Sequence, residues 1–248
     1  MDSTLLSIKE TVDIHLKIKV EKCVGCGKCV PICPVQAISI IDKKAVIDRD
    51  ACVECSTCYR IAICPNKAIR TERLKWPRLV RNPFSDVVAT HKLTGVPGRG
   101  TEEMKTNDVT GRFKPGELGF SIELGRPGVG TRLGEAEKFT TMLSKIGVQF
   151  EEASPLTSLI VDEQGHVKED IKKELVLSTI IEFKVPQEKL HDVLDAIKRL
   201  EPEVDTVFSV GVITRVDEDG SIPVIERLNE ERFNVRPNAK VNIGLGQL

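Results

Sequence analysis

Eight cysteines crowd into one short stretch of the chain, from Cys23 to Cys64. A disulfide-bonded secreted protein usually spreads its cysteines through the fold, whereas a reducing cytosol keeps thiols free. Deprotonated thiols are soft ligands, suited to zinc and to iron–sulfur clusters. We therefore interpret the eight thiols as metal ligands.

The spacing of the cysteines favours iron–sulfur clusters. The first run reads C-x2-C-x2-C-x3-C-P and extends from Cys23 to Pro34. Three thiolates at this spacing wrap one cubane, and the fourth cysteine of each run reaches the other cluster. Gly25 and Gly27 keep side chains out of the way and let backbone N–H groups point at cluster sulfurs. Two [4Fe–4S] clusters are therefore predicted, the first on Cys23, Cys26, Cys29 and Cys64, the second on Cys52, Cys55, Cys58 and Cys33.

Two features bear on this assignment. A pair of four-cysteine zinc sites is the main alternative, but such sites pair two CxxC halves and need no third cysteine followed by Cys-Pro. In addition, five residues separate Cys58 from Cys64, where the first run has three between its third and fourth cysteines. We expect the two extra residues to lengthen the helix or turn that carries Cys64. The ligand set should survive, because Cys64-Pro65 and Ala68-Ile69 mirror the first copy.

On these motifs the chain resembles the bacterial two-[4Fe–4S] ferredoxin family over about residues 12–72. The resemblance implies a module that moves single electrons at low potential. Residues 11–20 alternate between apolar and polar side chains, which predicts a half-buried strand leading into the first run. Residues 38–41 and 45–47 predict a small hairpin that turns at residues 42–44.

The whole chain is predicted to be an α+β protein with three parts. They are a two-cluster ferredoxin-like domain (1–72), a basic linker with a Gly-rich loop region (73–116) and an α+β domain (117–248). In the last part we expect strands at 117–124, 148–150, 175–185 and 204–216, and amphipathic helices at 134–146 and 186–200. Strand, helix and strand twice over favour a βαββαβ sandwich. The tail from residue 230 looks irregular, with one strand expected at 239–243.

Residues 91–126 hold the only other sequence with chemical character. Gly-rich turns close to Arg and Lys can hold phosphate or carboxylate, although neither a P-loop nor a Rossmann motif is present. The candidate residues for such an anion or cofactor site are Arg99, Lys105, Asn107, Asp108 and Arg112. A structured surface or interdomain loop explains the same composition. His91 could donate a proton or bind a metal, but a lone histidine is more often structural.

One segment of this region, PGRGTEEMKTNDVTG, follows the ferredoxin module. This arrangement is similar to iron–sulfur proteins grouped with 6-hydroxynicotinate reductase in anaerobic bacteria. The resemblance implies reduction of an aromatic heterocycle, with a flavin in the complex. The chain has no recognisable flavin motif of its own, which puts that activity in doubt for the isolated subunit.

Net charge and hydropathy indicate which partners and which cellular compartment to expect. A formal net charge of −1 argues against nucleic acid or an anionic membrane as the main partner. No apolar run reaches the length of about 18 residues that a membrane helix needs, and the first ten residues lack a secretory signal. We expect a cytoplasmic protein. Three interpretations remain for the basic segment 70–81. It is a docking patch for an acidic partner, it packs against the cysteine domain, or it is a solvated linker.

Three functions fit these observations. The favoured one is the iron–sulfur subunit of an anaerobic oxidoreductase that passes electrons to a catalytic or flavoprotein partner. The others are a self-contained reductase of a small anionic or heterocyclic substrate, and a ligand-binding regulatory protein. The first is favoured because the recognisable redox chemistry lies in the cysteine region and no catalytic constellation can be assembled elsewhere. The sequence leaves catalytic residues, substrate, partner, cluster potentials and self-association to a homo-oligomer open.

Overall fold

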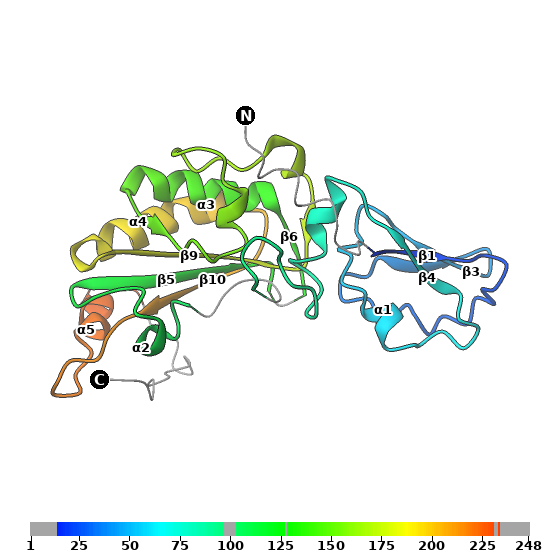
Figure 1. Cartoon of the computed structure of the whole chain (residues 1–248), viewed down its shortest axis with the longest axis horizontal. Coiled ribbons are helices and arrows are strands. Elements are labelled where there is room, and N and C mark those ends of the chain that lie inside the picture. Colours follow the sequence, from blue (N-terminus) through cyan, green and yellow to red (C-terminus); the bar gives the residue numbers. More distant parts are fainter. Residues whose placement is uncertain (1–13, 97–102, 127, 231–232, 234–248) are drawn as a thin grey trace.

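The computed structural model describes residues 14–96, 103–126, 128–230 and 233. These residues form two lobes at opposite ends of an elongated molecule (Figure 1). The small lobe runs from β1 to β4 and carries the cysteines, and the large lobe holds a sheet covered by helices. Within the described ranges, every helix is too short or too polar to cross a bilayer.

β1 and β4 form the first of two antiparallel strand pairs in the small lobe. They comprise Ile14–Ile18 and Ile69–Arg73. Leu16 and Ile18 are buried, whereas Lys17 between them is exposed. This alternation is that of a half-buried strand. The strand predicted for residues 11–20 ends at Ile18, Val20 is exposed, and residues 11–13 lie outside the described residues.

β2 (Ile38–Ile41) and β3 (Lys44–Ile47) form the second pair, a hairpin. Its two turn residues, Asp42 and Lys43, have φ angles of 47° and 59°. A type I′ turn needs positive φ at both central residues and matches the right-handed twist of the strands. The turn is one residue shorter than predicted, because Lys44 already belongs to β3.

The second cysteine run contains a short helix, α1 (Thr57–Arg60). Ile61 and Ala62 follow as a turn, and Ala62 has a φ of 50°. The corresponding part of the first run forms turns without a helix. The run with the two extra residues before Cys64 thus has a short helix and a turn where the first run has turns alone.

Thiols and aliphatic side chains share the core of the small lobe. Cys23, Cys29 and Cys58 are buried in one cluster with Leu16 and Ile38. A lobe of this size buries little apolar surface. Groups bound by its thiols would therefore contribute directly to its stability.

The segment after β4 passes between the lobes. It contains a 3-10 turn, η2 (Arg78–Arg81), and a short helix, α2 (Asn107–Thr110). Val80 and Phe84 are buried in the core of the large lobe. Val80 and Phe84 thus anchor this segment on the large lobe, whereas Val87, Val88 and Leu93 are exposed.

The large lobe is built on a four-stranded antiparallel sheet with the strand order β10-β5-β9-β7. Its strands are β5 (Glu117–Leu124), β7 (Gln149–Phe150), β9 (Thr179–Pro186) and β10 (Phe208–Ile213). Phe120 lies opposite Phe183, and their rings stack with centroids 5.0 Å apart. A separate pair joins β6 (Thr131–Arg132) to β8 (Leu175–Val176).

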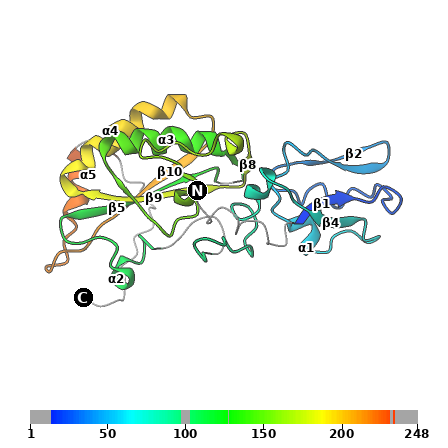
Figure 2. The same cartoon turned by 45° about the horizontal axis from the view of Figure 1, so that its top comes forward.

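Two helices cover one face of this sheet and lie side by side (Figure 1 and Figure 2). They are α3 (Leu133–Ile146) and α4 (Leu190–Leu200). Both are amphipathic, and Phe139 and Val193 on their apolar faces are fully buried. α3 ends at Gly147, whose φ of 77° is typical of a helix C-cap. The chain thus runs through β5, α3, β7, β9, α4 and β10 in that order.

The boundaries in the second half differ from the sequence-based expectations. The strand expected at 175–185 divides into β8 and β9, because Leu177 and Ser178 bond to the connecting segment. Leu177 N donates to Ser85 Oγ at 2.9 Å, and Ser178 N to the Phe84 carbonyl at 3.4 Å. Pro186 ends β9 instead of starting a helix, and η5 (Gln187–Lys189) precedes α4.

The last part of the chain contains an element that the sequence did not predict, α5 (Pro223–Glu230). Its Val224 and Leu228 are buried in the core of the large lobe. The strand expected at 204–216 is shortened to β10, and the one expected at 239–243 lies outside the described residues. The remaining 3-10 turns are η3 (Thr157–Leu159), η4 (Glu169–Ile171) and η6 (Glu201–Glu203).

Candidate iron–sulfur centres

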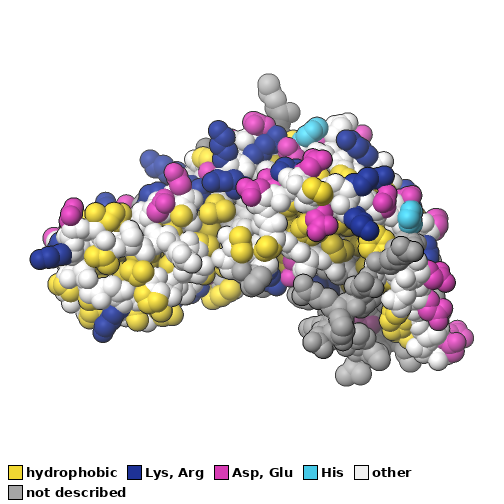
Figure 3. Space-filling model, turned by 180° about the vertical axis from the view of Figure 1, so that it is seen from behind, with side chains coloured by type: hydrophobic (Ala, Val, Ile, Leu, Met, Phe, Trp, Pro, Cys, Tyr) yellow, Lys and Arg dark blue, Asp and Glu magenta, His cyan; other side chains and the backbone are white. Residues whose placement is uncertain are grey.

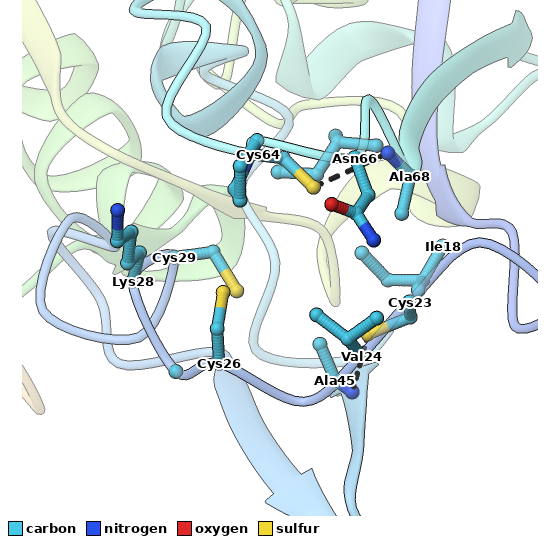
Figure 4. A pocket seen from close by; sticks show the side chains of 13 residues that line it. Ile18, Cys23, Val24, Cys26, Lys28, Cys29, Ala45, Cys64, Asn66 and Ala68 are labelled. Atoms are coloured by element: carbon cyan, nitrogen blue, oxygen red, sulfur yellow. Dashed lines mark hydrogen bonds between the residues drawn. The ribbon is translucent and has the colours of Figure 1, made fainter.

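Four thiols line one cavity at the end of the small lobe (Figure 4). Cys23, Cys26 and Cys29 come from the first run, and Cys64 comes from the second. Apolar side chains from β1, β3 and β4 complete the wall, among them Ile18, Ala45 and Ile69. Cys26 is exposed, so this cavity opens to solvent.

Electrostatics show the same grouping. Burial raises the pKa of the Cys29 thiol, and the charges of Cys23, Cys26 and Cys64 raise it further. Thiolates that repel one another in this way need a cation or a metal cluster to stay ionised together. The residues are arranged for such a group.

The other four cysteines form a second group. The pKa of Cys58 is raised to about 12, first by burial and then by the charges of Cys55, Cys52 and Cys33. The pKa of Cys52 is raised to about 11, again mainly by burial. Cys52, Cys55 and Cys58 are all buried, in contrast to the exposed Cys26 of the first group. Three thiols of one run and one of the other again lie together.

Backbone N–H groups point at the sulfur atoms, as the chemistry of a cluster requires. Ala37 N donates to Cys33 Sγ at 3.1 Å, and Ala68 N donates to Cys64 Sγ at 3.2 Å. These two contacts occupy the same place in each run, four residues after its last cysteine. For Cys64, burial acts to raise the pKa, but the N–H groups of residues 66–69 outweigh it and lower the pKa. A thiolate is therefore favoured at this position.

Left-handed backbone conformations recur at matching places in the two runs. In the first run they occur at Gly25 and Gly27, with φ of 67° and 74°. In the second run the equivalent residues are Glu54 and Ser56, with φ of 58° and 57°. A side chain makes this conformation costly, so the tertiary structure must hold the second loop in place. Both loops curve around their thiols in the same way.

The residues present fit iron–sulfur clusters. The donors are soft thiolates in two groups of four, and N–H groups reach sulfur atoms in both groups. Among the described residues, no three His, Cys, Asp or Glu side chains converge closely enough to hold a single metal ion.

Charged residues that sequence reasoning missed surround the second loop. Glu54 lies between Cys52 and Cys55 and is completely buried. Arg78 Nε donates to Glu54 Oε1 at 2.7 Å, and Arg81 Nη1 donates to the Cys52 carbonyl at 2.7 Å. The basic character of residues 70–81 was visible in the sequence. Its long-range partners were not, because they lie more than twenty residues away along the chain.

Three of the candidates for an anion site make different contacts. Lys105 pairs with Glu123 at 3.0 Å, and the Asn107 amide bonds both backbone groups of Phe113. Arg112 pairs with Glu103 at 2.9 Å and lines a polar cavity together with Lys184 and Glu151.

The structure places one of the other two candidates. Asp108 is half-buried in α2, and Arg99 lies outside the described residues. Of the described candidates, Arg112 is the one that lines the cavity. The grouping of the five as one site stays a prediction.

His91 lies in a partly buried pocket of the connecting segment. Its Nδ1 is 3.2 Å from Thr94 Oγ1, and its Nε2 is 3.4 Å from Ser158 Oγ. The ring meets Phe84 edge-on. Burial lowers the pKa of the imidazole. These contacts are those of a packed, neutral side chain.

Comparison with known proteins covers the first cysteine run. Residues 16–39 match the family described as 4Fe-4S binding domain. No curated protein and no solved structure matches the chain, so the similarity to the 6-hydroxynicotinate reductase group and the flavin gain no support. The matched residues include the last three residues of β1, the first cysteine run and the first two residues of β2. The chain therefore carries a 4Fe-4S binding domain, whose chemistry is iron–sulfur electron transfer.

Proposed function

We propose that the chain binds two [4Fe–4S] clusters and serves as the electron-transfer subunit of an oxidoreductase. The first cluster is held by Cys23, Cys26, Cys29 and Cys64, and the second by Cys52, Cys55, Cys58 and Cys33. One observation supports the proposal: Cys23, Cys26 and Cys29 of the first run line one cavity together with Cys64 of the second. When bound, each cluster takes up and releases one electron at a time.

Electrons enter at the first cluster, at the free end of the small lobe. Apolar side chains are exposed on that end of the molecule (Figure 3). Val20, Val24 and Ile41 are 56%, 62% and 53% exposed. Exposed apolar residues around a redox centre fit a protein partner, which excludes water as it docks.

The partner at this end carries acidic groups. Lys19, Lys22, Lys28 and Lys43 are exposed there, against the acidic Glu21 and Asp42. Opposite charges guide two proteins into an encounter and raise the association rate. The partner class is therefore an acidic redox protein, such as a flavoprotein subunit.

The order of elements in the large lobe supports the βαββαβ arrangement that was expected for residues 117–248. In the proposed function this lobe is the non-redox part that docks the chain in its complex. The cavity around Arg112 does not change this proposal. Its two basic side chains already pair with Glu103, Glu151 and Glu117.

The test is purification under anaerobic conditions, followed by iron and sulfide analysis and EPR of the reduced protein. We expect eight iron and eight sulfide atoms per chain, because two cubanes supply four of each. The native mass, measured with cofactors bound, then distinguishes a subunit from a self-contained reductase, because a subunit copurifies with a second polypeptide. Four iron atoms per chain, or zinc in their place, would overturn the two-cluster proposal.

A further inference from the structure

Two arginines of η2 reach the loop that carries the second thiol group. Arg81 is only 4% exposed, and its Nη1 donates to the carbonyls of Arg49, Asp50 and Cys52 at 3.2, 3.1 and 2.7 Å. Arg78 Nη2 donates to the same Cys52 carbonyl at 3.2 Å. Two guanidinium groups thus meet at the first cysteine of this run.

Glu54 fixes the position of Arg78. Its Oε1 accepts from Arg78 Nε at 2.7 Å, and its Oε2 accepts from Leu16 N at 3.3 Å. The carboxylate lies inside the loop, between Cys52 and Cys55, without exposure to solvent. A buried carboxylate of this kind needs paired hydrogen bonds, so the loop and Arg78 hold each other in place.

Arg81 also joins the two lobes. Its Nε donates to Glu174 Oε2 at 2.5 Å, and Glu174 immediately precedes β8 of the large lobe. The side chain of Arg81 therefore has a carbonyl of the cysteine loop at one end and a carboxylate of the large lobe at the other. Arg81 therefore links the charge of Glu174 electrostatically to the loop that holds Cys52.

The first thiol group has a weaker counterpart of this arrangement. Lys44 Nζ donates to the Cys23 carbonyl at 2.6 Å and to the Val20 carbonyl at 3.0 Å. Lys44 is only half-buried at the start of β3, whereas Arg81 is buried. Buried charges are screened far less than charges near solvent. The electrostatic effect of the two arginines on their thiol group should therefore exceed that of Lys44.

We propose that Arg78 and Arg81 raise the reduction potential of the second cluster, and that Glu174 moderates this effect through Arg81. Uptake of one electron from a low-potential one-electron donor makes the cluster more negative, with no bond made or broken. Burial of Cys52, Cys55 and Cys58 disfavours that extra charge. The two cations would offset part of this penalty, against the opposing charge of the buried Glu54, and would keep the second cluster reducible. The inference rests on the two-cluster function proposed above.

Redox titration of the full chain, monitored by EPR with dithionite and mediators, tests the inference. In Arg81→Gln we expect one of two midpoints to become more negative. At the original midpoint the reduced-to-oxidised ratio should fall about tenfold, which for a one-electron couple is about 59 mV. In Glu174→Gln the same midpoint should become less negative, because Arg81 loses its counter-charge. A purely structural role would not give shifts of opposite sign.

Further variants keep the test decisive. Lys44→Gln is the matched control and should affect the other midpoint. If Arg81→Gln fails to retain iron, the midpoints of Arg78→Gln and Glu174→Gln are compared instead. Arg78→Lys keeps the positive charge, so its midpoint should lie close to that of the wild type. Unchanged midpoints, or shifts of equal sign in Arg78→Gln and Glu174→Gln, would overturn the inference while leaving two clusters in place. A wild-type chain with a single cluster would instead overturn the proposed function.

Discussion

The backbone of Gly25 lies so close to Lys43 that a Cβ on Gly25 would be 2.1 Å from the Lys43 carbonyl oxygen. Real Cβ atoms do not approach an oxygen this closely, so one of the two segments would have to move. Gly25 belongs to the first cysteine loop and Lys43 to the turn between β2 and β3. The hairpin therefore sets how tightly the loop can curve around the first thiol group.

Gly25→Ala should displace this loop and impair the first cluster. We expect a lower iron content and the loss of one of two EPR signals, with the second signal retained. Gly27→Ala is the matched control, since Gly27 also has positive φ but a Cβ there would meet nothing within 4 Å. Both variants carry the backbone strain of a non-glycine residue, about 1–3 kcal/mol. Equal iron contents in the two variants would show that the contact with Lys43 is unimportant.

Removing the fourth cysteine of each run should damage different clusters. Cys64→Ser is expected to alter the cluster of the first run, because Cys64 lines its cavity. Cys33→Ser is expected to alter the cluster of the second run, whose Cys58 it approaches. EPR of each variant beside Cys26→Ser and Cys55→Ser identifies the affected cluster. If Cys64→Ser resembles Cys55→Ser, the exchange of ligands between the runs is wrong.

The local pattern of the sequence predicts a large part of this architecture. The strand at 117–124 has the predicted extent, and the helix predicted at 134–146 begins one residue earlier and ends at Ile146, where a glycine caps it. The hairpin after the first run was equally visible. The grouping of the thiols is predicted from their spacing, and the assignment of ligands depends on the variants above.

Long-range contacts set the features that the sequence did not reveal. The apolar run 175–185 reads as one strand, yet Ser85 and Phe84 bond to its middle and divide it. Likewise, Arg81 looked like one more charge in a basic stretch, whereas it is buried by partners at Cys52 and Glu174. No local periodicity encodes such pairings. Candidate residues in the Gly-rich region were chosen by type, and side-chain types alone do not say which of them meet.

Asn107 should be important for stability rather than for binding an anion. Its Oδ1 accepts from Phe113 N at 2.8 Å, and its Nδ2 donates to the Phe113 carbonyl at 3.0 Å. Asn107→Ala leaves two buried backbone groups unpaired, at a cost of about 1–3 kcal/mol. Denaturant unfolding measures this loss, and Val109→Ala, at a position 78% exposed, is the control. Unchanged stability in Asn107→Ala together with weaker phosphate binding would favour the anion site.

The two lobes should respond separately to a defect in the sheet. Phe183 is fully buried and stacks on Phe120, so Phe183→Ala should destabilise the large lobe by about 3–5 kcal/mol. The iron content and EPR spectrum should stay as in the wild type, because the thiol groups lie in the other lobe. Denaturant unfolding, monitored both by tryptophan fluorescence and by cluster absorbance, compares the unfolding of the two lobes. Simultaneous loss of both signals at the same lower denaturant concentration would mean that the lobes unfold as one unit.

His91 should make the protein less stable as the pH falls below neutrality. Burial lowers its pKa below the ordinary value of 6.5, so the unfolded chain takes up a proton first as the pH falls. The stabilisation is therefore complete above pH 6.5 and is lost as the pH falls through the lower, folded-state pKa. Thermal unfolding between pH 7.5 and 5.5 measures this loss. For a chain of this length, 1 kcal/mol corresponds to about 2–4 °C in Tm.

Two histidine variants isolate the cause of this pH dependence. His91→Gln removes the titrating group from its pocket between Phe84 and Ser158, so Tm should depend less on pH than in the wild type. His166→Gln is the control, because His166 lies on an exposed turn beside Asp162. If His91→Gln keeps the full pH dependence, another group must bind the proton. A neutral, packed His91 would then no longer explain the loss, and a role in proton transfer would need to be tested directly.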